Sequence, residues 1–383
     1  MMFDELQEIE GEEGFGGYDM AEPEGLLPPR DSTLCLGHEA VEQKLLNLIN
    51  SGAIPHALIF SGVQGIGKAT MGFKLARYLL KHGTADSAQD SLFGDAPLEA
   101  TSLDVAQDDP VFSRISSGGH ADFLYIERPT DPKGVQKNTI DVDTARKVAP
   151  FLRKTASDGG WRIVLVDDAD TMNRNAQNAL LKILEEPPSN ALLILITHRL
   201  GAMIPTIRSR CRVLSFDHLE QETLEQLMTR AVGDTVSSRE RKILTALAGG
   251  SMGAVQKIID AGGFDTIQMT LDLLEGWQNW NWVEIHHLAD SVARAGQADL
   301  FKNVELIMGW VTTQMVFSKA KKLERLEDPL ENEAFTALLN HYSLEEWVKI
   351  CDNLTEHFAQ AHFANLDKKQ AILGAFNIIK SSY

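Results

Sequence analysis

A glycine-rich segment that starts at residue 62 carries the residue types that bind phosphate. It follows an apolar stretch at 56–60 and contains Gly62, Gly65, Gly67, Lys68, Ala69 and Thr70. Glycine lacks a Cβ atom, so backbone N–H groups can approach an anion closely, and a helix that follows adds the positive end of its dipole. The Lys68 ammonium could reach terminal phosphates. The segment therefore predicts a phosphate-binding loop, and a purely structural glycine turn is the alternative.

One position departs from the pattern of a magnesium-dependent phosphate loop. Such a loop has serine or threonine after the lysine, whose hydroxyl binds Mg²⁺, whereas this chain has Ala69. Thr70 is rotated by about 100° further around a helix, so we expect its hydroxyl to face elsewhere. The sequence is therefore compatible with nucleotide binding, leaves the presence of Mg²⁺ open and argues against metal-assisted hydrolysis.

Two adjacent acids, Asp167 and Asp168, follow a second apolar stretch at 161–166. At the carboxyl end of a parallel strand, such carboxylates can hold Mg²⁺ and activate water. A hydrolytic site of this type normally carries Asp followed by Glu, so the carboxylate of Asp168 is one methylene short for a general base. We interpret the pair as a degenerate acidic motif at a strand end, with a solvated acid cluster as the alternative.

Arg210 lies just before a further predicted strand, in the run 205–211. Taken on its residues alone, an arginine at such a loop-to-strand junction is expected to form a local salt bridge or to contact a carbonyl.

The elements around these residues alternate between short apolar runs and amphipathic stretches from Asp31 to Asp217. The runs predict strands at 56–60, 123–127, 162–167, 192–197 and 212–216, and the amphipathic stretches predict helices at 39–51, 68–82, 141–155 and 174–186. This alternation is typical of an α/β fold with a parallel sheet covered by helices. A polar stretch at 83–109 is expected to be a surface excursion.

The whole chain is predicted to have four parts. Residues 1–30 hold nine acids and one base and are expected to form a disordered acidic tail, either solubilising or a docking peptide. The α/β module spans 31–217, a small helical module spans 218–263, and a larger all-helical domain spans 264–383, where helical periodicity replaces strand patterns.

Composition excludes several classes of protein. The chain has 383 residues and a net charge of −18, which would repel duplex phosphates, so independent DNA binding is not expected. No apolar run approaches the roughly 20 residues of a membrane span, and no secretory signal is recognisable, so we expect a cytoplasmic protein without membrane contact. Cys35, Cys211 and Cys351 are too few and too scattered for a zinc site or a disulfide framework.

Several segments together resemble a known family. The glycine-rich loop, the aspartate-ended strand, the run NALLKILEEPP at 178–188 and Ser209-Arg210-Cys211 resemble the bacterial clamp-loader ATPases of the AAA+ superfamily, over residues 33–262. The run 141–161 and residues 366–373 are most similar to the delta-prime subunits of DNA polymerase III. The resemblance implies an AAA+ P-loop module, a helical lid at 218–263 and a helical collar at 264–383 through which the subunits oligomerise.

Departures from the active motor subunits of that family point to a specific role. Beside Ala69 and Asp168, His198 stands near the polar first sensor of motors, and Gly253 stands where motors have arginine. Arg210, by contrast, matches the family's arginine finger. The resemblance therefore implies a stator that lacks ATPase activity or has very little, and that presents Arg210 in trans to ATP on a neighbouring subunit.

The resemblance also implies ligands and partners. The ligand would be ATP or ADP, bound weakly or without hydrolysis, and no zinc. The partners would be gamma/tau and delta-type subunits in a hetero-oligomeric ring, with the sliding clamp and primer-template DNA reached through the complex. Two rival functions stay open: an autonomous AAA+ ATPase, which is the motor itself, and a purely structural partner that binds no nucleotide.

Overall fold

The N-terminal half of the chain forms a five-stranded sheet. A computed structural model describes residues 27–83, 99–130, 136–157, 160–233, 236–260, 263–294, 298–326 and 328–380. The strands are β1 Ala57–Ser61, β2 Phe123–Ile126, β3 Arg162–Val166, β4 Ala191–Thr197 and β5 Arg212–Ser215. They lie in the order β2-β3-β4-β1-β5, and every neighbouring pair is parallel. The predicted α/β fold class with a parallel sheet is confirmed.

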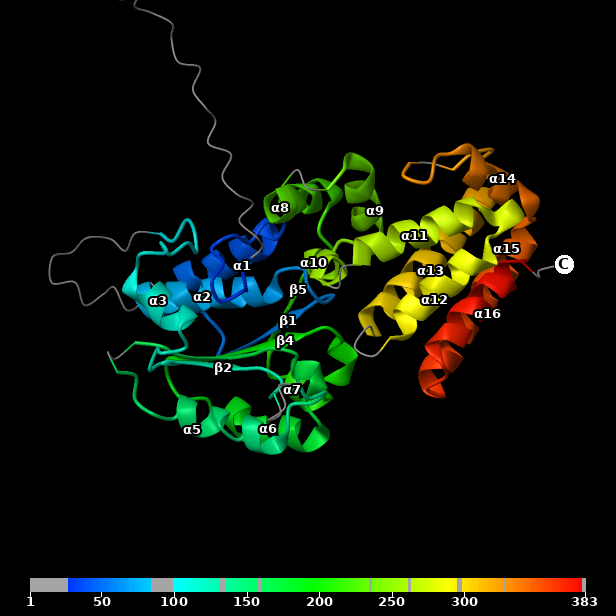
Figure 1. Cartoon of the computed structure of the whole chain (residues 1–383). Helices are drawn as coiled ribbons and strands as arrows, with labels where there is room; N and C mark the ends of the chain where they lie inside the picture. The colour runs from blue at the N-terminus through cyan, green and yellow to red at the C-terminus, as the bar shows by residue number, and fades with distance from the viewer. Residues whose placement is uncertain are drawn as a thin grey trace, which may run out of the picture.

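Helices cover both faces of this sheet (Figure 1). One face carries α1 Glu39–Asn50, α2 Lys68–His82 and α3 Pro110–Ser116, and the other carries α4 Val142–Ala145, α5 Val148–Leu152, α6 Arg174–Glu185 and α7 Pro205–Arg208. Alternate residues of β1 feed the two cores, because successive side chains of a strand point to opposite faces. Leu58 and Phe60 lie in one core, and Ala57 and Ile59 lie in the other.

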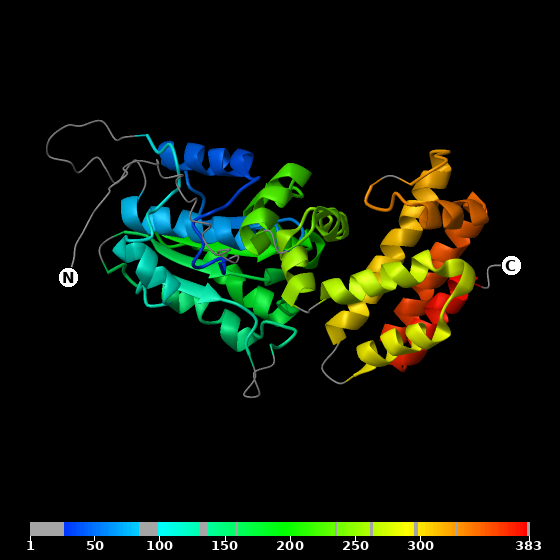
Figure 2. The same ribbon diagram turned by 45° about the horizontal axis from the view of Figure 1, so that its top comes forward.

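The rest of the described chain is helical. Three helices follow the sheet: α8 Gln221–Val232, α9 Ser238–Ala248 and α10 Met252–Asp260. Beyond them lie α11 Gly263–Glu275, α12 Trp282–Ala293, α13 Ala298–Ala320, α14 Glu333–His341, α15 Leu344–Phe363 and α16 Lys368–Lys380, which pack on one another away from the sheet (Figure 2). The apolar spacing predicted for α15 is confirmed, since Trp347, Ile350, Leu354 and Phe358 are all buried. None of the described helices combines the length and apolarity needed to span a bilayer.

Two expectations were wrong in detail. The single helix predicted at 141–155 is two short helices, α4 and α5, because Pro150 has no N–H for the carbonyl four residues earlier and its ring collides with it. The polar stretch at 83–109 is not entirely a surface excursion. Residues 84–98 lie outside the described residues, but Leu103 is fully buried and Lys74 on α2 pairs with Asp104 at 2.9 Å.

The predicted acidic tail lies outside the described residues up to position 26, and residues 28–30 contact the α/β part. Two hydrogen bonds hold this stretch in place. The buried Arg77 guanidinium and the half-buried Ser116 hydroxyl both donate to the Arg30 carbonyl. The boundaries predicted at 217 and 263 stay predictions.

Candidate functional site: a phosphate loop joined to a strand-end dyad

The glycine-rich loop connects β1 to α2, as predicted, and turns its carbonyls away from bulk solvent. All six carbonyls of residues 62–67 accept hydrogen bonds. The donors are Lys68 Nζ for Gly62 and Val63, Ser251 Oγ for Gln64, Gly253 N for Gly65, His38 Nε2 for Ile66, and Met71 N for Gly67. The amides of residues 63–70 find no acceptor in the part of the chain that the structure describes. A loop with anchored carbonyls and unsatisfied amides is a nest for an anion.

Glycine is required at two positions of this loop. Gly65 has φ +77° and Gly67 has φ +105°, a left-handed region that other residues enter only with strain. Gly67 also precedes the first residue of α2, Lys68, so the loop and the helix N-terminus present their amides to the same space.

A cavity of about 390 Å³ lies over the loop. Its lining joins the loop residues 64–70, Ala69 and Thr70 among them, to the acidic strand end, with Asp167 and Asp168, and to His198. Apolar side chains complete it: Leu34, Leu36, Leu219, Leu227 and Met252. This combination of an apolar wall and a polar end within a volume of about 300–1,000 Å³ is typical of small-molecule sites.

The lysine of the loop is turned inward. Lys68 is 3% exposed, and its ammonium donates to the carbonyls of Gly62 at 2.8 Å and Val63 and to His198 Nδ1 at 3.0 Å. These three acceptors use all three ammonium hydrogens. Burial lowers the pKa of Lys68 to about 8, against the opposing effect of the nearby acids.

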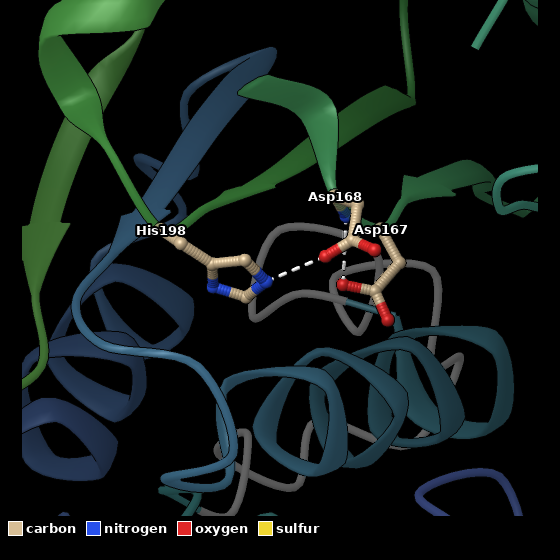
Figure 3. A group of neighbouring side chains, drawn as sticks. All are labelled: Asp167, Asp168 and His198. Atoms are coloured by element: carbon tan, nitrogen blue, oxygen red, sulfur yellow. Dashed lines mark hydrogen bonds and ion pairs between the residues drawn. The ribbon is translucent and has the colours of Figure 1, made fainter. Parts of the chain in front are cut away.

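His198 links the lysine to the acidic strand end. Figure 3 shows its ring hydrogen-bonded to Asp168, with Asp167 beside them. Because Lys68 donates to Nδ1, the proton of a neutral imidazole is on Nε2, which donates to Asp168 Oδ1 at 2.5 Å. The hydrogen bond from His198 lowers the pKa of Asp168. The three residues come from α2, from the loop after β4 and from the end of β3, and the parallel sheet brings these ends to one edge.

The remaining carboxylate oxygens of this edge also have partners. Asp168 Oδ2 accepts from Arg128 Nε at 2.8 Å. Asp167 Oδ1 accepts from the Asp168 amide at 2.9 Å, and its Oδ2 accepts from the Tyr125 hydroxyl at 3.2 Å. Burial raises the pKa of Asp167. Sequence reasoning missed Tyr125 and Arg128, although both sit at or just beyond the end of β2, where an α/β sheet gathers its polar groups.

A helix much later in the sequence, α10, also contacts the phosphate loop. The N-terminus of α10 packs against it: Gly253 N donates to Gly65 O at 2.9 Å, Ser251 Oγ donates to Gln64 O at 2.7 Å, and Lys257 Nζ donates to Gln64 Oε1 at 2.8 Å. A Cβ atom placed on Gly253 would lie 2.6 Å from Gly65 Cα. Position 253, where the family resemblance implies an arginine in motor subunits, thus has no room for a side chain in this chain.

Replacing Gly253 by alanine should therefore destabilise the chain by about 1–3 kcal/mol, because the added methyl forces two backbones apart. Thermal unfolding should show a lower melting temperature, and hydrogen exchange of residues 64–67 should rise. Gly309→Ala on α13 is the matched control, since nothing lies within 4 Å of a Cβ there. Equal melting temperatures for the two variants would refute the close contact.

Arg210 lies apart from this cluster. It precedes β5, and its guanidinium donates to Thr206 O at 3.1 Å and pairs with Glu185 Oε1 at 3.0 Å, with the side chain 36% exposed. These are the local salt bridge and the carbonyl contact expected from the residues alone. The structure thus brings the loop residues together with Asp167, Asp168 and His198 at the carboxyl ends of the strands. Arg210 lies at the opposite end, before the start of β5.

Comparison with known proteins finds similarity over about half of the chain. Residues 37–220 match a family model described as "DNA polymerase III, delta subunit". The delta' subunit of Pseudomonas aeruginosa is 32% identical over 207 residues, which cover 54% of this chain and 56% of that protein. The delta' subunit of Escherichia coli is 31% identical over 214 residues, covering 55% and 57%. A DNA polymerase III gamma subunit of Buchnera aphidicola is 26% identical over 227 residues, covering 58% and 56%.

The chain spans a little over half the length of these curated relatives. The residues matched by the family model, 37–220, contain all five strands of the sheet. The order of loop, acidic strand end and Ser-Arg-Cys lies inside the matched region. Residues 37–220 of this chain are therefore similar to DNA polymerase III delta-type subunits, with bacterial delta' subunits among the similar proteins.

Proposed function

We propose that this chain is a delta-prime-like stator subunit of a replicative clamp loader. It would supply Arg210 in trans to ATP bound by a neighbouring subunit during loading of the clamp onto primed DNA. The observation that carries the proposal is the distance of Arg210 from the chain's own phosphate loop.

That distance follows from strand register. β5 is parallel to β1, with Arg212 beside Leu58 and Ser215 beside Ser61. Arg210 thus precedes the start of β5, while the phosphate loop follows the end of β1. At about 3.3 Å per residue, the four paired positions alone separate the two by roughly 10–13 Å along the strands. An arginine at the opposite end of the sheet is too far away to contact the chain's own phosphate loop, which supports a role toward a ligand outside that pocket.

The local contacts of Arg210 suit such a role. Thr206 O and Glu185 hold one side of the planar guanidinium, and more than a third of the side chain is exposed. A guanidinium has five N–H donors, so hydrogens remain for a phosphate of a neighbouring subunit. Since β5 is one of the two edge strands of the sheet, this donor lies at a border where a second subunit could approach.

We further propose that the cavity binds ATP or ADP without productive hydrolysis. The loop amides would hold the phosphates beside the buried positive charge of Lys68, and the apolar wall would hold the base. The bound nucleotide would not be hydrolysed, because Ala69 has no hydroxyl for Mg²⁺ and both carboxylate oxygens of Asp168 already accept hydrogen bonds from the protein. A motor subunit would need a hydroxyl after Lys68 and a carboxylate that is free to act in hydrolysis, so the geometry favours the stator.

The pKa of Lys68 makes nucleotide affinity depend on pH. Lys68 of the free protein loses its proton near pH 8, whereas bound phosphate would keep it protonated. Affinity should be highest below pH 8 and should weaken by up to about tenfold for each pH unit above it. Titration of a fluorescent ADP over a pH series measures this. Lys68→Arg, which stays charged, should give a flat profile, and a flat wild-type profile would contradict the account.

The collar, proposed as residues 264–383, would join the chain to its partners. Among the described residues, most of the large hydrophobic side chains that are exposed belong to it: Met269, Val283, Leu306, Phe317, Val348, Phe363 and Leu366. The proposed partners are gamma/tau and delta-type subunits, with the clamp and primer-template DNA reached through the cytoplasmic complex. Affinity purification from the source cells followed by mass spectrometry should recover those subunits, and their absence would overturn the proposal.

A further inference from the structure

We infer that the cavity accepts a nucleoside diphosphate without a divalent cation, because Arg128 and His198 occupy the carboxylate oxygens that would otherwise bind the metal. The inference rests on the proposed nucleotide pocket and names the ligand form that it takes. It concerns the pocket alone and is independent of the role of Arg210.

The residues present do not fit a magnesium site. Mg²⁺ in a phosphate loop needs oxygen ligands in near-octahedral positions, usually a hydroxyl and one or two carboxylates. Ala69 supplies no hydroxyl. Asp168 Oδ1 accepts from His198 at 2.5 Å, and Asp168 Oδ2 accepts from Arg128 at 2.8 Å. A cation approaching Asp168 would have to displace a guanidinium, which stays protonated at any pH that a protein tolerates.

Asp167 and His198 cannot replace the missing ligands. One ligand atom from each of Asp167, Asp168 and His198 lies within 4.8 Å of the others, a spacing that by itself would suit a metal. Both ring nitrogens of His198 are bonded, however: Nδ1 accepts from the Lys68 ammonium, and Nε2 donates to Asp168. Asp167 accepts from the Tyr125 hydroxyl and from a backbone amide. Metal binding would require this network to break at several places.

Charge balance favours two phosphates over three. Lys68 is the one lysine or arginine among the described residues that line the cavity, and Asp167 and Asp168 line the same end. A diphosphate can be held by the unsatisfied loop amides, with the buried Lys68 ammonium as the nearby positive charge. A third phosphate would add negative charge near these carboxylates with no metal between them. ATP should therefore bind no more tightly than ADP.

The test compares binding of fluorescent ADP to the full chain in buffers with Mg²⁺ and with EDTA. The dissociation constant should change by less than about threefold, which is less than about 0.7 kcal/mol. A larger loss of affinity in EDTA would overturn the inference, and so would no saturable binding at millimolar ADP. Lys68→Met should abolish binding in both buffers, which assigns the signal to this cavity. Neither result would change the ATPase turnover expected for the Arg210 variants of the assembled complex, so failure of this inference is distinguishable from failure of the proposed stator role.

Arg128→Gln gives a second, opposite expectation. The side chain is 25% exposed, so the variant should fold. Removing the guanidinium leaves Asp168 Oδ2 without its counter-charge. ADP should then bind about tenfold more weakly in EDTA, and Mg²⁺ should restore part of the affinity. Arg199→Gln, which removes a neighbouring guanidinium paired with Asp170 instead, is the matched control and should stay insensitive to Mg²⁺. An Arg128→Gln variant that also ignores Mg²⁺ would overturn the role assigned to Arg128.

Discussion

Arg210→Ala should reduce the ATPase turnover of a reconstituted clamp loader by about 10³–10⁵ at the sites that face this chain, the usual contribution of an arginine finger. The reason is geometric, because a planar guanidinium can donate two parallel hydrogen bonds to a phosphate as negative charge develops on it. Arg210→Lys should rescue poorly, since an ammonium is a point charge without this fork. Turnover normalised to assembled particles measures the effect.

The structure supplies a sharper control for this variant. Arg210 pairs with Glu185, so a role as an internal brace would make Glu185→Gln as harmful as Arg210→Ala. A finger predicts the opposite, because Glu185→Gln removes only a partly exposed salt bridge worth about 0–1 kcal/mol. Arg208→Ala, an exposed arginine two residues earlier, should leave turnover unchanged. Equal losses for Arg210→Ala and Glu185→Gln would support the brace.

The second large effect concerns assembly. A chain ending at residue 262 should fail to join the complex, because it lacks the helices α11 to α16 and their exposed apolar side chains. Size-exclusion chromatography with the partner subunits measures this. Deleting residues 1–26 is the control, and that chain should assemble normally. Assembly of the chain ending at 262 would contradict the oligomerisation role proposed for 264–383.

A fold defect has to be separated from a lost interface in that experiment. Far-ultraviolet circular dichroism and thermal unfolding of the shortened chain report whether its α/β part remains folded. Phe363→Asp offers an independent variant, since its side chain is 95% exposed at the end of α15 and carries no core contact. It should weaken assembly while leaving the melting temperature of the isolated chain unchanged, because the ring is exposed in the isolated chain and the proposed partner contacts would bury it.

Local periodicity was sufficient to predict most of the sheet and its helices. The helix at 68–82 is observed with the predicted bounds, and each predicted strand is present within one residue at either end. The hydrophobic periodicity that specifies each of these elements depends only on residues close together in the sequence. The helix predicted at 141–155 failed because amphipathic spacing was weighed above Pro150, whose missing N–H decides the backbone there.

The connections between elements could not be predicted in the same way. The loop lysine and the strand-end acids were identified from their types and His198 from the family resemblance. That His198 bridges Lys68 and Asp168 depends on the strand order β3-β4-β1. The contact between Gly65 and Gly253 joins residues 188 positions apart and depends on where α10 packs. Arg128 was missed because its partner depends on β2 lying beside β3.

The central claim, that this chain lends an arginine to its neighbour and turns over no ATP itself, is tested most directly by comparing two reconstituted complexes. One contains the chain with Lys68→Ala, which damages its own pocket, and the other contains the chain with Arg210→Ala. The account predicts that turnover per assembled particle stays within about twofold of wild type for Lys68→Ala and collapses for Arg210→Ala. Collapse with Lys68→Ala and unchanged turnover with Arg210→Ala would contradict it and identify the chain as a motor.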